Sequence, residues 1–296
     1  MTLPNFIVIG QMKAGTSSLH AYLRQHPDIF MPSVKELRFF SEVISEDGKR
    51  LLVDDAYRRT RVTRGMPVTF AEYEALFEPA AGRRGRGEAS PEYANSPRAP
   101  AQIAKYLPEV RLIVSLRHPA DRLYSQYQMM KRGGRIDSDF RSAFRAGQSE
   151  SWVRGSFSYE ALKRYYERFD ASRIKAIKFD ALADRTQATL QELFDFLGVD
   201  RSFRPDTSTV HNEGGDFKSA LLGRLSGRVQ GNRALMDRLK TMMPAAAWRV
   251  GKEIVRSNKD KAPPLTSELR REVAQHYRDD TLKLQELVGL DLSDWL

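Results

Sequence analysis

The chain has 296 residues, of which 41% are hydrophobic and 29% charged, and its 48 Lys and Arg residues against 38 Asp and Glu give a formal net charge of +10. The absence of cysteine excludes disulfides, thiolate zinc sites and cysteine nucleophiles. No apolar stretch approaches membrane-spanning length, and the first candidate strand begins near Asn5, which leaves no room for a secretory signal. We therefore expect a cytoplasmic protein without a membrane span, whose positive charge favours an anionic partner.

The stretch at residues 6–19 joins a short apolar run, a turn and a helical pattern. Phe6–Ile9 is rich in β-branched residues and too short for a helix, so it predicts a buried strand. A turn that ends at Gly15 follows, and helical spacing of apolar residues begins at Thr16. The amides of such a turn and the positive end of the helix dipole converge on one point, where Lys13 adds a full charge. The stretch therefore predicts a phosphate-binding loop.

The position of the lysine differs from that in the P-loop of nucleotide triphosphatases. In that loop the lysine directly follows the second glycine and precedes a Ser or Thr. Here Lys13 comes before Gly15, and Thr16 follows that glycine. The loop therefore predicts phosphate binding without a triphosphatase signature, and an ordinary strand-to-helix turn that needs glycine is the alternative.

Strand and helix patterns alternate along the next two thirds of the chain. Buried strands are predicted at Arg111–Leu116 and Ile174–Phe179, and amphipathic helices at Phe70–Phe77, Pro100–Leu107, Tyr159–Phe169, Thr186–Leu197 and Glu268–Val288. We interpret Gly82–Gly87 as a loop, and Ser41–Pro67 and Gly133–Gly155 as a flap and a lid over an acceptor site. The alternation predicts an α/β, P-loop-like three-layer fold with a central, mostly parallel sheet flanked by helices. We expect a single domain over residues 1–296, helical from about residue 217.

A second anion-binding position is predicted at the end of the strand Arg111–Leu116. Ligands of open α/β sheets bind beyond the carboxyl ends of the strands, which is where Arg117 lies in sequence. Ser125 follows eight residues later in a helical pattern, and its hydroxyl could share an anion that the arginine holds. The alternative is an arginine that serves only as a surface charge or a helix-end partner.

Glu36 is the candidate acid–base residue nearest to the predicted loop in sequence. It lies in a polar segment that closes on two aromatic residues, Phe39 and Phe40. From spacing alone, the favoured interpretation is a surface carboxylate paired with Lys35 or Arg38. The histidine that competes most directly for the role of base is His211, in the polar loop before two glycines.

Two other functions are compatible with these features. A kinase that uses ATP would need magnesium and an acid at a strand end, and Asp180 is the only comparable acid. A nucleic-acid-binding protein would use the net charge of +10, but aromatic residues are not interleaved with the basic ones as base stacking requires. A lysine on one phosphate and an Arg/Ser pair on another instead suit a ligand with two separate phosphates and no metal.

Together the two motifs resemble those of sulfotransferases that use 3′-phosphoadenosine 5′-phosphosulfate (PAPS). The segment at residues 10–19, GQMKAGTSSL, resembles the loop that binds the 5′-phosphosulfate. Arg117-His118-Pro119 with Ser125 resembles the 3′-phosphate motif, and similarity extends over essentially the whole chain to the pattern at Leu284–Trp295. The resemblance is closest to the carbohydrate sulfotransferases of the heparan sulfate type and their bacterial relatives.

The resemblance implies a role for each matching residue within a single sulfotransferase domain. Glu36 matches the catalytic base, and Lys13 contacts the bridging oxygen of the donor. The cofactor-binding set it implies is Lys13, Ala14, Gly15, Thr16, Ser17, Ser18, Arg117, Ser125, Gly214 and Gly215. PAPS would be the donor and 3′-phosphoadenosine 5′-phosphate (PAP) the product, with no metal, and the acceptor would be a small molecule or glycan bearing a hydroxyl.

Two departures from the family pattern concern the acceptor. Glycan-modifying relatives often carry lysine in the segment that matches Glu88-Ala89-Ser90-Pro91, where this chain has Ala89. Animal relatives also have a membrane anchor and a disulfide. This chain has no cysteine, and we expect it to have no anchor. The resemblance therefore does not imply a polymeric heparan acceptor, nucleic acid is not an expected partner, and the sequence leaves the oligomeric state open.

Overall fold

The computed structural model describes residues 2–147, 150–208, 216–217, 259–260 and 263–296. Its contacts divide the chain into two compact units. The first unit comprises Met1–Arg122, Gly155–Asn212 and Val273–Leu296, and the second comprises Leu123–Arg154 and Glu213–Glu272. The expectation of a single domain stays a prediction, and the units are described separately below.

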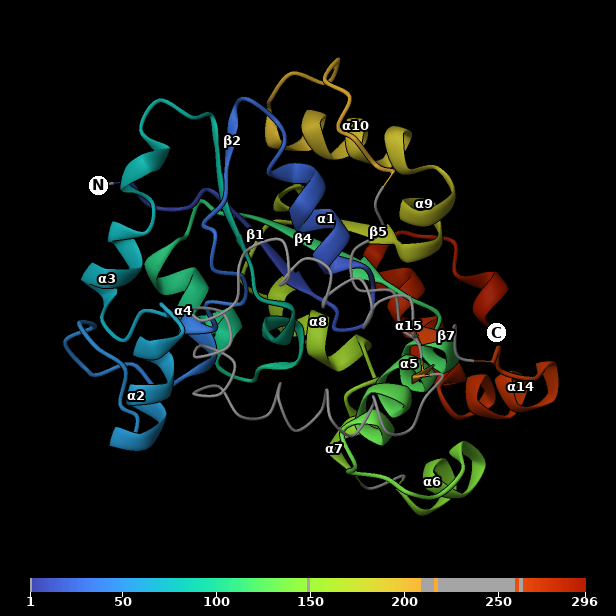
Figure 1. Cartoon of the computed structure of the whole chain (residues 1–296). Helices are drawn as coiled ribbons and strands as arrows, with labels where there is room; N and C mark the ends of the chain where they lie inside the picture. The colour runs from blue at the N-terminus through green and yellow to red at the C-terminus, as the bar shows by residue number, and fades with distance from the viewer. Residues whose placement is uncertain (1, 148–149, 209–215, 218–258, 261–262) are drawn as a thin grey trace. The chain divides into compact units, whose positions relative to one another are not determined.

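The first unit is built around a five-stranded parallel sheet in the order β2-β3-β1-β4-β5 (Figure 1). The strands are β1 (Phe6–Gly10), β2 (Ile29–Phe30), β3 (Gly85–Ala89), β4 (Arg111–Leu116) and β5 (Ile174–Lys178). Every residue of β1 is buried, and this strand pairs with β3 on one side and β4 on the other. The mostly parallel sheet predicted from the sequence is therefore confirmed.

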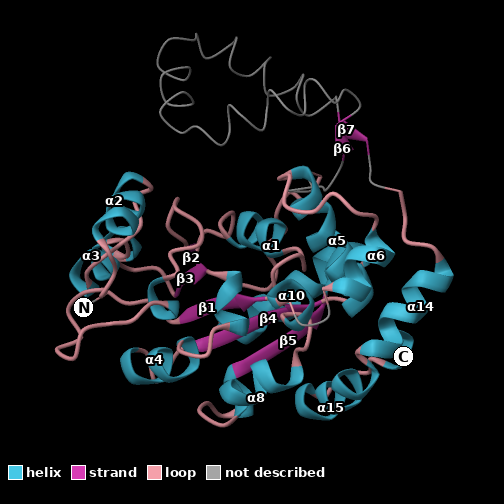
Figure 2. Ribbon diagram, turned by 90° about the horizontal axis from the view of Figure 1, so that it is seen from below, coloured by secondary structure: helices cyan, strands magenta, loops and turns pink. Residues whose placement is uncertain are grey.

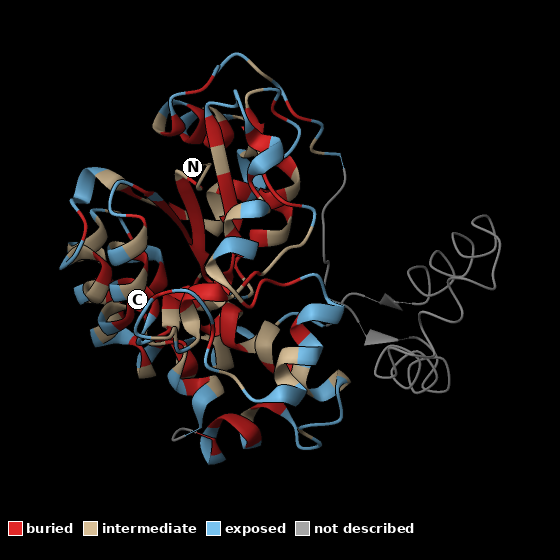
Figure 3. Ribbon diagram, turned by 90° about the vertical axis from the view of Figure 1, so that its left-hand side faces the viewer, coloured by how far each residue is buried: buried red, intermediate tan, exposed pale blue. Residues whose placement is uncertain are grey.

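Helices cover both faces of this sheet, as Figure 2 shows. Side chains alternate between the two faces along each strand. Phe6 and Val8 of β1 belong to a hydrophobic cluster with α1 (Thr16–Leu23) and α10 (Thr186–Leu197). Ile7 and Ile9 belong to a second cluster with α4 (Ala99–Tyr106), α8 (Tyr159–Tyr166) and α15 (Arg278–Val288). The sheet is thus the buried middle layer of three (Figure 3).

β3 corrects the prediction of a loop over Gly82–Gly87. Its sequence Gly-Arg-Gly-Glu-Ala lacks the β-branched and aromatic residues that mark a strand. Glycine is needed here because the neighbouring strands place large side chains against the backbone of β3. A Cβ atom on Gly87 would lie 2.1 Å from the ring of Phe6, and one on Gly85 would lie 2.9 Å from Ile29. The glycines of β3 are therefore required by the space that neighbouring side chains leave, and strand propensity does not predict this strand.

We expect Gly87→Ala to destabilise the first unit by about 1–3 kcal/mol, the usual cost of an extra methyl group in a close-packed interior. Chemical denaturation with the midpoint and slope compared to wild type measures the change. Gly133→Ala is the matched control, because its added Cβ would meet only backbone oxygens at 3.5 Å. Equal stabilities of the two variants would contradict the packing argument.

The other elements of the first unit connect the strands. They are α2 (Asp55–Thr63), α3 (Phe70–Ala75), α9 (Phe179–Asp184) and the 3-10 turns η1 (Phe39–Ser41), η2 (Glu78–Ala80), η3 (Pro91–Asn95), η4 (Ala171–Arg173) and η5 (Ser293–Trp295). α2 lies in the predicted flap Ser41–Pro67. The single helix predicted over Glu268–Val288 is wrong, because the chain forms α14 (Ser267–His276) and α15 with the fully buried Tyr277 between them.

The described residues of the second unit form helices and one short antiparallel pair of strands. The helix α5 (Pro119–Arg132) runs from the first unit into it, followed by α6 (Phe140–Ala146) and α7 (Ser151–Arg154). The paired strands are β6 (Asp216–Phe217) and β7 (Lys259–Asp260). Arg141 of α6 pairs with Glu268 and Glu272 at 2.8 and 3.2 Å, which joins α6 to α14. No helix in the described part of the chain is both long and apolar enough to cross a membrane.

Candidate active site at the carboxyl edge of the sheet

The turn between β1 and α1 has the geometry of an anion-binding loop. β1 ends at Gly10 and α1 begins at Thr16. Gly15 is the N-cap of α1 with a φ of 76°, a left-handed conformation that favours glycine. A Cβ on Gly15 would lie 2.9 Å from the ring of Phe179. Because glycine has no side chain to cap the helix, the first turn of α1 can direct its backbone amides at an anion.

Lys13 and Arg117 meet at this turn. Lys13 has a φ of 71°, which is uncommon for a residue with a side chain and concentrates at functional sites. Its carbonyl oxygen accepts a hydrogen bond from Nη1 of Arg117 at 3.0 Å. The guanidinium carbon of Arg117 lies 4.6 Å from the centroid of the Phe179 ring, the same ring that approaches Gly15. The backbone of Lys13 and the guanidinium of Arg117, from distant parts of the sequence, therefore lie together beside the glycine-capped helix start.

Burial lowers the pKa of Arg117, and the charges of Asp121 and Asp180 partly oppose this effect. An arginine remains protonated at physiological pH despite such a shift. Burial also raises the pKa of Asp180, and the charge of Asp121 acts in the same direction. The partly desolvated guanidinium would gain from contact with an anionic group, because charge interactions strengthen where water is excluded.

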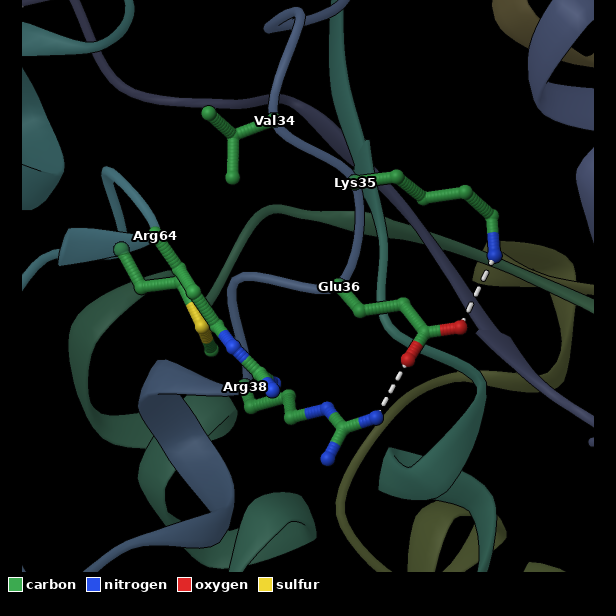
Figure 4. A pocket seen from close by; sticks show the side chains of 6 residues that line it. Val34, Lys35, Glu36, Arg38 and Arg64 are labelled. Carbon is green, nitrogen blue, oxygen red and sulfur yellow. Dashed lines mark hydrogen bonds and ion pairs between the residues drawn. The ribbon is translucent and has the colours of Figure 1, made fainter. Parts of the chain in front are cut away.

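Glu36 lies on a segment that is hydrogen-bonded to the carboxyl end of β3. Its backbone N–H donates to the carbonyl oxygen of Ala89 at 3.0 Å. Its carboxylate accepts from Nζ of Lys35 at 3.2 Å through one oxygen and from Arg38 through the other (Figure 4). Arg38 also pairs with Glu92, at 3.1 Å through Nε. The pairing that the sequence favoured for Glu36 is thus present with both neighbours, and the side chain is 36% exposed.

These contacts decide the protonation state of Glu36. Partial burial raises the pKa of its carboxyl, but the hydrogen bond and charge of Arg38, together with those of Lys35, outweigh burial and hold the pKa below its usual value. Glu36 is therefore ionised throughout the neutral range, which a proton acceptor requires. Its φ of 64° and that of Arg38, 54°, are further left-handed conformations in residues with side chains.

Sheet topology brings the three groups to one edge. β3, β1 and β4 are adjacent parallel strands, so their carboxyl ends lie together. Glu36 is anchored beyond the end of β3, Lys13 follows β1, and Arg117 follows β4. Ligands of open parallel sheets bind at such an edge. The fold and this edge define an α/β protein of the P-loop-like type.

A small open hollow of about 110 Å³ lies beside Glu36. It is lined by Val34, Lys35, Glu36, Arg38, Arg64 and Met66. Figure 4 shows Arg64 extending from the opposite wall toward the hollow that Glu36 and Arg38 line. Three cationic side chains and a single carboxylate therefore line this hollow.

The remaining predicted residues divide into three groups. Ala14, Thr16, Ser17 and Ser18 lie at the end of the turn and in the first turn of α1 as expected, with Thr16 and Ser18 buried. Ser125 lies on α5 within the second unit, so its pairing with Arg117 stays a prediction. Gly214, Gly215 and His211 lie outside the described residues. Across the described ranges, no three His, Asp or Glu side chains gather as a metal site would need.

Two buried charged residues of this edge were missed by the sequence interpretation. Arg61 is 0% exposed and donates to the carbonyl oxygens of Leu37 and Pro67 at 2.7 and 2.9 Å, although it belongs to a stretch expected to be a polar flap. Glu88 is 2% exposed and lies in the strand that was predicted to be a loop and turn. No local pattern reveals either residue, because burial of each depends on tertiary packing, which brings Leu37 to Arg61 and Tyr73 to Glu88.

Comparisons with known proteins show which family the chain belongs to. Residues 4–203 match the model of the sulfotransferase family. Mouse bifunctional heparan sulfate N-deacetylase/N-sulfotransferase 4 is 25% identical over 315 residues, which cover 99% of this chain and 31% of the mouse protein. The membrane-associated sulfotransferase kil1 of Dictyostelium discoideum is 32% identical over 136 residues, which cover 45% of this chain and 25% of that protein. The chain thus spans at most about a third of the length of these curated relatives.

A solved structure covers the whole chain. The sulfotransferase from Alicyclobacillus acidocaldarius aligns with a TM-score of 0.67 and 26% identity over 100% of this chain and 99% of its own. The chain belongs to the sulfotransferase family, and its relatives include carbohydrate sulfotransferases. The resemblance drawn from the two sequence motifs is therefore confirmed at the level of the family, whose chemistry is sulfuryl transfer.

Proposed function

We propose that this protein transfers the sulfuryl group of PAPS to an acceptor hydroxyl by in-line displacement, with Glu36 as the base. The observation that carries the proposal is the convergence of the glycine-capped start of α1, Arg117 and the Glu36 segment at one sheet edge. A helix N-terminus and an arginine suit a donor with two separate phosphates, and the carboxylate suits removal of a proton. Membership of the sulfotransferase family supports the same assignment.

The donor site we propose uses the turn and the first turn of α1. Lys13 would neutralise the charge that grows on the leaving phosphate, and Thr16, Ser17 and Ser18 would hold that phosphate with their hydroxyls and amides. Left-handed backbone at Lys13 and Gly15 in a turn that leads into a helix is typical of anion-binding loops, which supports this assignment. Gly214 and Gly215 complete the proposed set by resemblance alone.

Arg117→Ala is expected to weaken PAP binding by about tenfold to a hundredfold, the loss typical of a charge-assisted hydrogen bond of about 1.5–3 kcal/mol. The reason is that we assign the guanidinium to the 3′-phosphate. Calorimetric titration with PAP and with adenosine 5′-phosphosulfate, which lacks that phosphate, separates the two phosphate positions. Equal loss for both ligands would contradict the assignment of Arg117.

Glu36 would take the hydroxyl proton as the acceptor attacks. Its ion pairs with Lys35 and Arg38 keep it ionised and hold it at the mouth of the hollow. The cationic walls formed by Lys35, Arg38 and Arg64 favour an acceptor that carries an anionic group near its reacting hydroxyl. We propose a glycan as the acceptor class, in keeping with the heparan sulfate enzymes among the relatives.

The test is acceptor-dependent formation of PAP from PAPS without added metal. An oligosaccharide should be supplied in three forms, neutral, carboxylated and sulfated, and each form with its amino group free or N-acetylated. Turnover with the anionic, N-acetylated forms is the expected result, because hydroxyls are then the only nucleophiles. Turnover confined to the free-amine forms would replace the hydroxyl acceptor by an amine, and no PAP release with any acceptor panel would contradict the proposal.

A further inference from the structure

The buried carboxylate of Glu88 is held by three hydroxyl groups. Oε1 accepts from the hydroxyls of Tyr73 at 2.9 Å and Tyr93 at 3.2 Å, and Oε2 accepts from Oγ of Ser90 at 2.7 Å. No salt bridge to Glu88 is present among the described residues, although the charge of Arg61 acts on it from a distance. Burial raises the pKa of Glu88 to about 7 in spite of these hydrogen bonds. Burial of a carboxylate without an ion pair costs folding free energy, which indicates that Glu88 has a function.

Two of the three hydroxyls also contact the segment that bears Glu36. Oγ of Ser90 accepts the backbone N–H of Arg38 at 3.0 Å, and the hydroxyl of Tyr93 accepts the backbone N–H of Phe40 at 3.2 Å. Each hydroxyl has one hydrogen, so donating it to Glu88 leaves the lone pairs to face these amides. The ionised carboxylate therefore orients both hydroxyls as acceptors for the segment at residues 36–40.

This segment needs external support. Glu36 and Arg38 both have left-handed backbone conformations, which persist in residues with side chains only where the surroundings determine them. The carbonyls of Leu37 and Arg38 accept from Arg61 and Ser41. Three N–H groups of the segment are also held: that of Glu36 by the carbonyl of Ala89, and those of Arg38 and Phe40 by Ser90 and Tyr93. The acceptors of these three N–H groups come from β3 and the turn after it, and two of them depend on Glu88.

We propose that Glu88 is a positioning residue for the base: through Ser90 and Tyr93 it holds the Glu36 segment in the conformation that presents the carboxylate to the acceptor. The proposal rests on the assignment of Glu36 as the base. Glu88 itself touches neither the hollow nor the phosphate-binding turn, and acts only through the backbone of residues 36–40.

The three hydroxyls provide a matched set of variants. Tyr93→Phe and Ser90→Ala each remove one hydroxyl from Glu88 and one hydrogen bond to the segment. Tyr73→Phe removes a hydroxyl from Glu88 but no hydrogen bond to the segment, and it keeps the ring that contacts Phe39 and Phe40. We expect Tyr93→Phe and Ser90→Ala to lower kcat by about tenfold to a hundredfold, as misplaced catalytic groups do, with PAPS KM and PAP affinity unchanged. Tyr73→Phe should keep kcat near wild type. Equal kcat losses in all three variants would overturn the positioning role.

Amide hydrogen exchange gives a readout that needs no turnover. Exchange should accelerate at Arg38 in Ser90→Ala, at Phe40 in Tyr93→Phe, and at both in Glu88→Gln, while Tyr73→Phe leaves both slow. Unchanged protection in Glu88→Gln would overturn the proposal. Glu36→Gln in the same turnover assay tests the base itself: full activity there would overturn the assignment of the base, a result distinct from equal losses in the hydroxyl variants.

Discussion

Glu36→Gln is expected to reduce kcat by about 10²–10⁴-fold while leaving PAP affinity unchanged. The amide cannot accept the acceptor proton, although it has the shape of the carboxyl. Lys35 and Arg38 contact different oxygens of the carboxylate, and the single oxygen of the amide keeps one of these hydrogen bonds. Because the pKa of Glu36 lies below the usual carboxyl value, protonation of Glu36 itself should lower wild-type kcat only at acidic pH, below any change that protonation of Glu88 causes near pH 7. Initial rates at saturating PAPS, with PAP titration of each variant, measure both effects.

Glu92→Gln is the matched control for charge. Glu92 pairs with the same Arg38, at 3.1 Å, and accepts from Ser41 at 2.6 Å. Its replacement removes an equal charge next to the same guanidinium without removing the proposed base. A loss of kcat in Glu92→Gln as large as that in Glu36→Gln would show that local charge matters rather than proton transfer. Wild-type turnover of Glu36→Gln would show that Glu36 is not the base.

Lys13→Met is expected to lower kcat by about 10²–10³-fold, the usual consequence of losing one group that stabilises charge developing in the transition state. The thioether side chain has a similar length, so the turn can keep its left-handed backbone while the charge is lost. PAP affinity should fall by less than kcat, since the charge grows on the leaving phosphate during reaction. Single-turnover rates and PAP titration separate the two quantities.

The control for Lys13 is Lys13→Arg, which keeps the charge in a planar, longer group. It should bind PAP much as wild type does but recover only part of the turnover, because the guanidinium cannot occupy the position of an ammonium. A Lys13→Met enzyme with wild-type kcat and weakened PAP binding would instead place the lysine in donor binding alone.

The local sequence pattern was sufficient to predict the helices and strands that have a clear apolar periodicity. The run at residues 6–9 predicted β1, and Arg111–Leu116 and Thr186–Leu197 match β4 and α10 to the residue. β3 could not be predicted, because its glycines are required by contacts with Phe6 and Ile29, which lie on other strands. The break between α14 and α15 could not be predicted either. The buried Tyr277 at the junction fits the helical spacing of apolar residues, so the sequence pattern predicts one continuous helix.

The site residues that follow strand ends could be predicted from the sequence, whereas those that are brought together by burial could not. Lys13 and Arg117 follow apolar strands, and the carboxyl ends of parallel strands converge whatever lies between them in sequence. The pairs of Glu36 with Lys35 and Arg38 followed from sequence neighbourhood. The Glu88 cluster joins residues from α3, β3 and η3, and only the tertiary structure brings these hydroxyls to one carboxylate.

Thermal unfolding in the presence of PAP, without metal, tests the central claim most directly. A ligand at about 100 times its dissociation constant stabilises the folded protein by about 2.7 kcal/mol, a readily measured shift. Parallel samples should contain AMP, ATP with magnesium, and a short single-stranded DNA. We predict a large shift with PAP alone and a reduced one in Arg117→Ala. A larger shift with ATP and magnesium than with PAP would contradict the two-phosphate donor site and favour a kinase.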